Sequence, residues 1–224
     1  MTAPPSQPAR PQPAAHPQLD GLIVTMERLR APGGCAWDRA QTHESLVRYL
    51  VEESAELVEA IEDGSREERI EELGDVLYQV LFHADIATEA GEFTIEDVAE
   101  HMNRKMVGRH PHVFGDAVAD TPDAVAVSWE AIKAVEKSDR TSVLDGIPPA
   151  MPALALAEKI VGRAAKVGVV PEAAPVPATE DELGAQLLAL VTGARDAGLD
   201  PERALRSAIR GLRSEVRAAE AEAG

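Results

Sequence analysis

The chain has 224 residues, enough for one or two small domains with a hydrophobic core. Aromatic residues make up only 3% of it, which favours helix packing over sheets, and a formal net charge of −17 argues against nucleic acid as a partner. Its single cysteine, Cys35, cannot form an internal disulfide, which fits a reducing cytoplasm. We expect Cys35 to be a small packed residue without a chemical role. The sequence shows neither a membrane-spanning apolar run nor a signal-peptide pattern, so we expect no membrane partner.

Apolar periodicity and capping residues predict one all-α domain over residues 19–170, after a disordered Pro- and Ala-rich extension at 1–18. The first helix is predicted at about 19–30, followed by a loop at 35–38. Later helices are predicted to start with caps at Thr42, Ser65, Thr94 and Thr121. A further helix is expected at about 153–166.

Two acidic segments lie beside apolar helical stripes. Glu53 and Glu56 are three residues apart, as are Glu72 and Asp75, so each pair projects from one face of its helix. Such charge runs usually face solvent. If packing brings the two helices together, however, the four carboxylates need a cation, and oxygen ligands suit Mg²⁺ or Mn²⁺. Gly74, which costs about 1 kcal/mol relative to Ala inside a helix, predicts close helix approach there.

Other residues leave alternatives open. A carboxylate-bridged di-iron site would need Glu-x-x-His motifs, whereas Glu56 and Asp75 occupy those histidine positions. Lys105 and Arg109 form an i,i+4 pair, and Trp129 and Lys133 have the same spacing on the next helix. In so acidic a chain these cations are either salt-bridge partners of the carboxylates or a clamp for phosphate.

In their order and spacing, these motifs resemble the MazG family of nucleoside triphosphate pyrophosphohydrolases over about residues 22–169. The matching segments are Arg28-Leu29-Arg30, the Cys-x-Trp-Asp loop at 35–38, Gln41-Thr42, the two acidic segments, the run from Arg109 to Gly115, Trp129-Glu130 with Lys133, and Gly146-Ile147-Pro148. Ala36 departs from the proline that many members have in the loop, which should have a small effect.

The resemblance implies an all-α homodimer and Mg²⁺-dependent cleavage of a nucleoside triphosphate to the monophosphate and pyrophosphate. It assigns Glu53, Glu56, Glu72 and Asp75 as metal ligands, with Glu52 placed to orient or deprotonate water. Lys105, Arg109 and Lys133 match contacts to the triphosphate, and Trp129 matches a position near the nucleoside. Stacking on an aromatic ring predicts broad base tolerance. The leading hypothesis is therefore an enzyme that clears nucleotides from the pool. The alternatives are a narrower dNTP pyrophosphatase and a non-catalytic module that binds nucleotide or a partner.

The last third resembles a decayed copy of the first part. After a linker at 171–179, Glu182-Leu183-Gly184-Ala185 repeats the pattern of Glu72-Leu73-Gly74-Asp75. Ala185 replaces the ligand aspartate, and Gly211 and Glu215 fall opposite Lys105 and Arg109. We therefore expect residues 180–224 to form a catalytically inactive second repeat that covers apolar surface of the first domain or stabilises the dimer.

Overall fold

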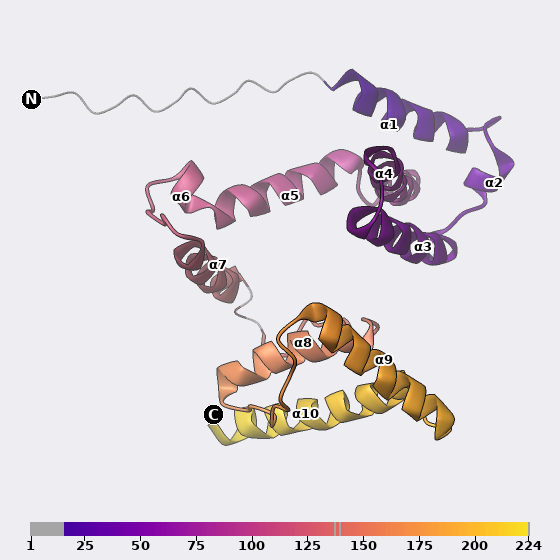
Figure 1. The fold of residues 1–224 in the computed structure, drawn as a ribbon. Coiled ribbons are helices and arrows are strands. Elements are labelled where there is room, and N and C mark those ends of the chain that lie inside the picture. Colours follow the sequence, from indigo (N-terminus) through magenta and orange to yellow (C-terminus); the bar gives the residue numbers. More distant parts are fainter. Residues whose placement is uncertain (1–15, 137, 139, 224) are drawn as a thin grey trace, which may run out of the picture. The chain divides into compact units, whose positions relative to one another are not determined.

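The computed structural model describes residues 16–136, 138 and 140–223, and the regular elements among them are helices (Figure 1). The predicted all-α fold is confirmed. Most of the predicted disordered extension lies outside the described residues. Contacts within the chain define two compact units, one ending at Val125 and the other beginning at Ala126. The domain boundary predicted at 171–179 stays a prediction.

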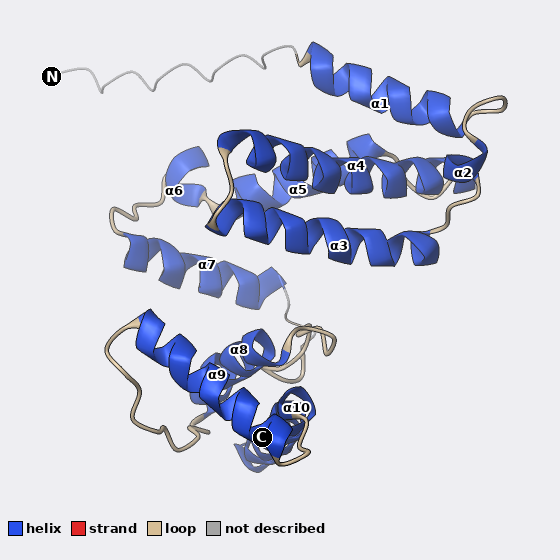
Figure 2. Ribbon diagram, turned by 45° about the vertical axis from the view of Figure 1, so that its right-hand side comes forward, coloured by secondary structure: helices blue, strands red, loops and turns tan. Residues whose placement is uncertain are grey.

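The N-terminal unit contains α1 (Pro17–Arg30), α2 (Ala36–Arg39), α3 (His43–Glu62), α4 (Arg66–Ala90), α5 (Ile95–Arg109) and α6 (Pro111–Phe114) (Figure 2). Capping side chains fix where α3, α4 and α5 begin. The hydroxyls of Thr42, Ser65 and Thr94 accept hydrogen bonds from backbone N–H groups three residues further on, which completes a capping box at each helix start. Each cap contributes about 1 kcal/mol, and the predicted starts are confirmed.

Two local predictions need correction. The segment predicted as a loop at 35–38 contains the single helical turn α2, because the backbone N–H of Arg39 bonds back to the carbonyl of Cys35. The close helix approach predicted at Gly74 is wrong for contacts within the chain. A Cβ added to Gly74 would meet no described atom within 4 Å. Helices α3 and α4 therefore pack together without using this glycine.

The core of the N-terminal unit joins α1, α3 and α4. Met26, Leu46, Leu81 and Phe82 are buried in one cluster. Beside them Arg30 is also buried: its guanidinium donates to Asp85 and Glu89 of α4, at 2.7 Å each, and to the backbone carbonyl of Asp38 at 2.6 Å. A buried guanidinium needs such partners, because leaving it unpaired would cost several kcal/mol. This network attaches α1 and α2 to α4.

The core of the C-terminal unit is formed mainly by two helices. After α7 (Pro122–Glu136), this part of the chain contains α8 (Ala153–Ala164), the 3₁₀ turn η1 (Ala165–Val167), α9 (Glu180–Asp196) and α10 (Pro201–Ala223). Leu156 and Ile160 of α8 pack in one cluster with Ile209 and Val216 of α10. Helix α9 buries no side chain, although Thr179 caps its start. Helix α10 therefore covers apolar surface of α8.

No helix in the described part of the chain has the length and apolar character needed to cross a membrane.

Candidate active site

The acidic residues lie on a hairpin of two packed helices. A short turn around Gly64 connects α3 to α4, and the two helices run alongside each other (Figure 2). The cap at Ser65 starts α4 directly after the turn, so the two acidic segments come to the same end of the hairpin. The sequence achieves this through local signals alone: a glycine at the turn and a capping box at the next helix.

Three of the predicted ligands lie together. Glu53 and Glu56 of α3 and Glu72 of α4 each offer one carboxylate oxygen, and these three atoms lie within 4.8 Å of one another. Glu53 and Glu72 are half-buried, whereas Glu56 is exposed. The Oε2 atom of Glu72 is buried and has no hydrogen-bond partner among the described residues. A buried acceptor without a partner is costly, and a cation would satisfy it.

The electrostatics of the cluster disfavour negative charge. Burial raises the pKa of Glu53, and the neighbouring charges of Asp75 and Glu56 raise it further. Burial also raises the pKa of Glu72, and Glu56 and Asp75 add to that shift. Asp75 thus acts on both residues, although it lies outside the compact set of three. Glu52 is exposed and contributes only a minor share of the Glu53 shift.

An acidic cavity opens beside these residues. It has a volume of about 420 Å³ and is lined by Glu56, Glu59, Asp63, Glu68 and Glu72 together with Ala60 and Gly64. So many carboxylates repel an anionic ligand unless divalent cations offset their charge. An all-oxygen donor set with a buried unpaired oxygen fits a hard ion such as Mg²⁺, which protein carboxylates bind well.

The predicted cations divide between the two units. Lys105 and Arg109 lie on α5, where Lys105 is half-buried and forms no ion pair within the described part of the chain. Arg109 is buried. Lys105 is therefore not a salt-bridge partner of the acidic cluster within the N-terminal unit, which leaves its ammonium group available to an anion.

Trp129 and Lys133 belong to the C-terminal unit. The Nζ atom of Lys133 lies 5.7 Å from the centre of the Trp129 ring, so the i,i+4 spacing does bring this pair together. Lys133 also forms an ion pair with Glu130, and Lys166 reaches the same carboxylate at 2.6 Å. Sequence reasoning missed both partners. The i,i+3 spacing of Glu130 and Lys133 was a usable signal, whereas Lys166 is 36 residues away.

The helical hairpin with its clustered carboxylates defines a candidate site for a divalent cation in an all-α protein. The model of the MazG nucleotide pyrophosphohydrolase domain matches residues 41–114, which include the hairpin and α5. A protein of Streptomyces cacaoi known as the uncharacterized 26.1 kDa protein in the blaB 3′ region is 47% identical over 207 residues, covering 91% of this chain and 83% of the relative.

Relatives with descriptive names are also similar over long stretches. The Thermotoga maritima nucleoside triphosphate pyrophosphohydrolase/pyrophosphatase MazG is 45% identical over 211 residues, covering 86% of this chain and 81% of the relative. The Escherichia coli K12 nucleoside triphosphate pyrophosphohydrolase is 42% identical over 154 residues, covering 67% of this chain and 59% of the relative. The chain belongs to the MazG pyrophosphohydrolase family and is an enzyme.

Proposed function

We propose that this enzyme hydrolyses nucleoside triphosphates to nucleoside monophosphates and pyrophosphate with Mg²⁺ bound to Glu53, Glu56, Glu72 and Asp75. The single observation that supports it best is the convergence of three carboxylate oxygens within 4.8 Å, beside a buried Glu72 oxygen that no described group satisfies. The names of the Thermotoga maritima and Escherichia coli relatives support the same reaction class. Mn²⁺ suits the same ligands.

The chain's own residues divide the work of the reaction. A triphosphate resists attack largely because its negative charge repels nucleophiles, and a bound Mg²⁺ would offset that charge and lower the pKa of a coordinated water. Glu52, exposed next to Glu53 in the sequence, would orient water or accept its proton. Lys105 and Arg109 would stabilise the charge that moves onto the leaving pyrophosphate, and Lys133 would make a third contact to the triphosphate.

Base tolerance follows from the nature of the nucleoside contact. The Trp129 ring offers a stacking face, which every base accepts, and its neighbour Lys133 supplies charge but no base-specific pattern. We therefore propose activity on several NTPs and a role in clearing nucleotides from the pool. A strong preference for one dNTP would instead identify a narrower dNTP pyrophosphatase.

We further propose that the active form is a homodimer in the cytoplasm. Both hairpin helices expose large apolar side chains, including Val51, Val58 and Ile61 on α3 and Ile70 and Leu73 on α4. Exposed large apolar side chains mark an interaction site when they form one surface, as we propose for these. Sedimentation equilibrium of the parent and of Leu73→Glu tests the dimer. A monomeric parent at micromolar concentration would remove this part of the proposal.

The activity itself is tested by measuring pyrophosphate and monophosphate released from a panel of ribo- and deoxyribonucleoside triphosphates, with Mg²⁺ and with EDTA. We expect products from several NTPs in Mg²⁺ only. Glu53→Gln and Asp75→Asn, if their circular dichroism shows a folded protein, should lose most of the rate. Equal rates in these variants and the parent would reject the proposed site.

A further inference from the structure

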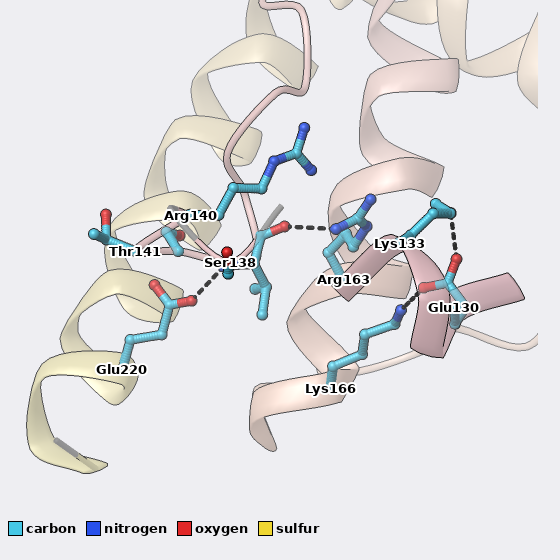
Figure 3. Close-up of a pocket in the computed structure, with 10 residues that line it drawn as sticks. Glu130, Lys133, Ser138, Arg140, Thr141, Arg163, Lys166 and Glu220 are labelled. Atoms are coloured by element: carbon cyan, nitrogen blue, oxygen red, sulfur yellow. Dashed lines mark hydrogen bonds and ion pairs between the residues drawn. The ribbon is translucent and has the colours of Figure 1, made fainter. Parts of the chain in front are cut away.

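The C-terminal unit contains a basic pocket in which Lys133 is the one residue that has a role in the proposed reaction. It has a volume of about 460 Å³, within the usual range for small-molecule sites. Figure 3 shows its charged side chains, which come from α7, α8, α10 and the segment around residue 140. The charged lining residues are Lys133, Arg140, Arg163, Lys166, Glu130 and Glu220. Four cations against two carboxylates leave a local positive excess in a chain whose net charge is −17.

Both carboxylates of the pocket are already engaged. Glu130 accepts hydrogen bonds from Lys133 and Lys166, which lower its pKa to about 2, so it stays ionised and occupied. Glu220 accepts a hydrogen bond from the backbone N–H of Val143 at 2.7 Å. Neither is paired with an arginine of the pocket in the described structure, so the arginine charges are not cancelled by direct contact.

The two arginines present unused donors. The guanidinium of Arg140 has no hydrogen bond or ion pair with any residue that the structure describes. Arg163 uses Nη1 to bind the carbonyl of Val143 at 3.0 Å, and its other N–H groups have no carboxylate partner among the described residues. Guanidinium groups match phosphate oxygens with two parallel hydrogen bonds, which lysine cannot do.

The surrounding chain leaves room for the Arg140 side chain. Gly146 has a φ of +75°, and a Cβ built there would lie 2.2 Å from an Nη atom of Arg140. Any larger residue would therefore displace the guanidinium. Asp145 stabilises the turn at residues 141–145, because its carboxylate accepts hydrogen bonds from the backbone N–H groups of Thr141 and Ser142 at 3.0 Å each. Arg140 directly precedes this hydrogen-bonded turn.

A second cavity extends the basic surface. It has a volume of about 470 Å³, shares Glu130, Lys133, Arg163 and Lys166 with the first, and adds Lys159 and Glu158. The cations of the two cavities can therefore contact more than one phosphate group of the same ligand. We propose that this basic pocket is a second anion site that binds condensed phosphate, of which inorganic pyrophosphate is the simplest member. Arg140, Arg163 and Lys166 are its ligands, with Lys133 at the edge shared with the proposed substrate contacts.

Isothermal titration calorimetry of the full chain with inorganic pyrophosphate in EDTA tests this site. Without divalent ions the carboxylates of α3 and α4 repel the probe, so binding reports the basic pocket. We expect one site per chain and at least a tenfold weaker affinity for Arg140→Gln, because a charge-assisted bidentate contact is lost. Arg195→Gln, with the same charge change at an exposed position of α9, should bind as the parent does.

Several results would overturn the assignment. These are absence of binding at millimolar pyrophosphate, equal affinities for Arg140→Gln and Arg195→Gln, and equal affinity for inorganic phosphate. If Lys105→Gln removes binding while Arg140→Gln keeps it, the anion occupies the proposed substrate site. Among the described residues Arg140 has no hydrogen bond or ion pair, so Arg140→Gln should stay folded, and thermal melts check this. Hydrolysis is measured separately in Mg²⁺, so an inactive chain that still binds pyrophosphate would reject only the proposed function.

Discussion

Helices α4 and α9 share a sequence pattern but differ in what surrounds it. Glu72-Leu73-Gly74 and Glu182-Leu183-Gly184 each lie inside a helix, and each helix is followed by a left-handed glycine, Gly91 with φ +72° or Gly198 with φ +68°. Helix α4 packs along α3, whereas α9 buries no side chain.

This difference shows that the sequence pattern alone does not bring carboxylates together. Glu72 meets Glu53 and Glu56 because the preceding helix folds back onto α4. Glu182 is exposed, and the residues directly before it, 171–181, contain no Glu-Glu-x-x-Glu segment. Origin of α9 and α10 from a second repeat remains a prediction, consistent with a copy that kept its local helix signals and lost its partner.

The largest effect should come from matched substitutions in the two copies. We expect Glu72→Gln to lower the rate of NTP hydrolysis by about 100- to 1000-fold, because it removes a proposed ligand of the cation that would stabilise transition-state charge. Glu182→Gln should leave the rate within about twofold, as for most exposed positions. Steady-state pyrophosphate release measures both. Similar losses in the two variants would mean that the copies are functionally equivalent.

A metal-linked shift in stability should also separate the copies. At a Mg²⁺ concentration 100 times its dissociation constant, the folded chain gains about 2.7 kcal/mol, and we expect Glu53→Gln to lose most of this gain. Glu182→Gln should keep it. Thermal melts with and without Mg²⁺ measure this shift. The same melting temperature of the parent protein in both conditions would contradict the prediction.

The same carboxylates give the metal-free chain a pH dependence. The pKa values of Glu53 and Glu72 are raised above 4.5 in the folded state, so that state binds more protons than the unfolded chain in the window just above pH 4.5. Their contribution to stability therefore falls as pH rises through that window. Glu53→Gln in EDTA should flatten this part of the profile, and Glu182→Gln should not.

Packing differences between α9 and α10 predict the next effect. Ile209 of α10 is only 4% exposed in the core with α8, and Ile209→Ala should destabilise the chain by at least about 2 kcal/mol. Leu188 of α9 is 67% exposed, and Leu188→Ala should change stability by less than about 0.5 kcal/mol. Urea unfolding gives both values. A large loss in Leu188→Ala would show that α9 is covered in solution.

The smallest effect concerns a contact unique to the first hairpin. The rings of His43 and His83 stack at 5.0 Å, and burial, together with the charge of His43, lowers the pKa of His83. His83 is therefore protonated at a higher pH in the unfolded chain than in the folded chain. The free energy of unfolding should decline as pH falls through about 6.5. In His83→Gln this decline should shrink. An unchanged slope between pH 7.5 and 5.5 in thermal melts would argue against it.

The predictions from sequence succeeded where the cause is local. Thr42, Ser65, Thr94 and Thr179 cap helices because a hydroxyl satisfies N–H groups only three residues away. The grouping of Glu53, Glu56 and Glu72 followed from helix periodicity plus one short turn. These relations need no knowledge of distant contacts.

Relations between distant residues could not be predicted in this way. Lys166 reaches Glu130 across 36 positions, and Arg206 of α10 bonds the carbonyl of Met151 across 55. The prediction of close helix approach at Gly74 was wrong because helix propensity shows only that a glycine is unusual inside a helix. It does not show which residues lie opposite that glycine. The site roles of all the candidate residues stay predictions, namely those of Glu52, Glu53, Glu56, Glu72, Asp75, Lys105, Arg109, Trp129 and Lys133.

The short turn between α3 and α4 also bears on the order of folding. Contacts between helices joined by so few residues close small loops, whereas α8 and α10 must meet across the whole of α9 and its flanking segments. Because loop closure costs more entropy as the intervening chain lengthens, we expect the acidic hairpin to gain hydrogen-exchange protection before the α8–α10 pair does. Nascent chains would then possess the carboxylate cluster before the basic pocket exists.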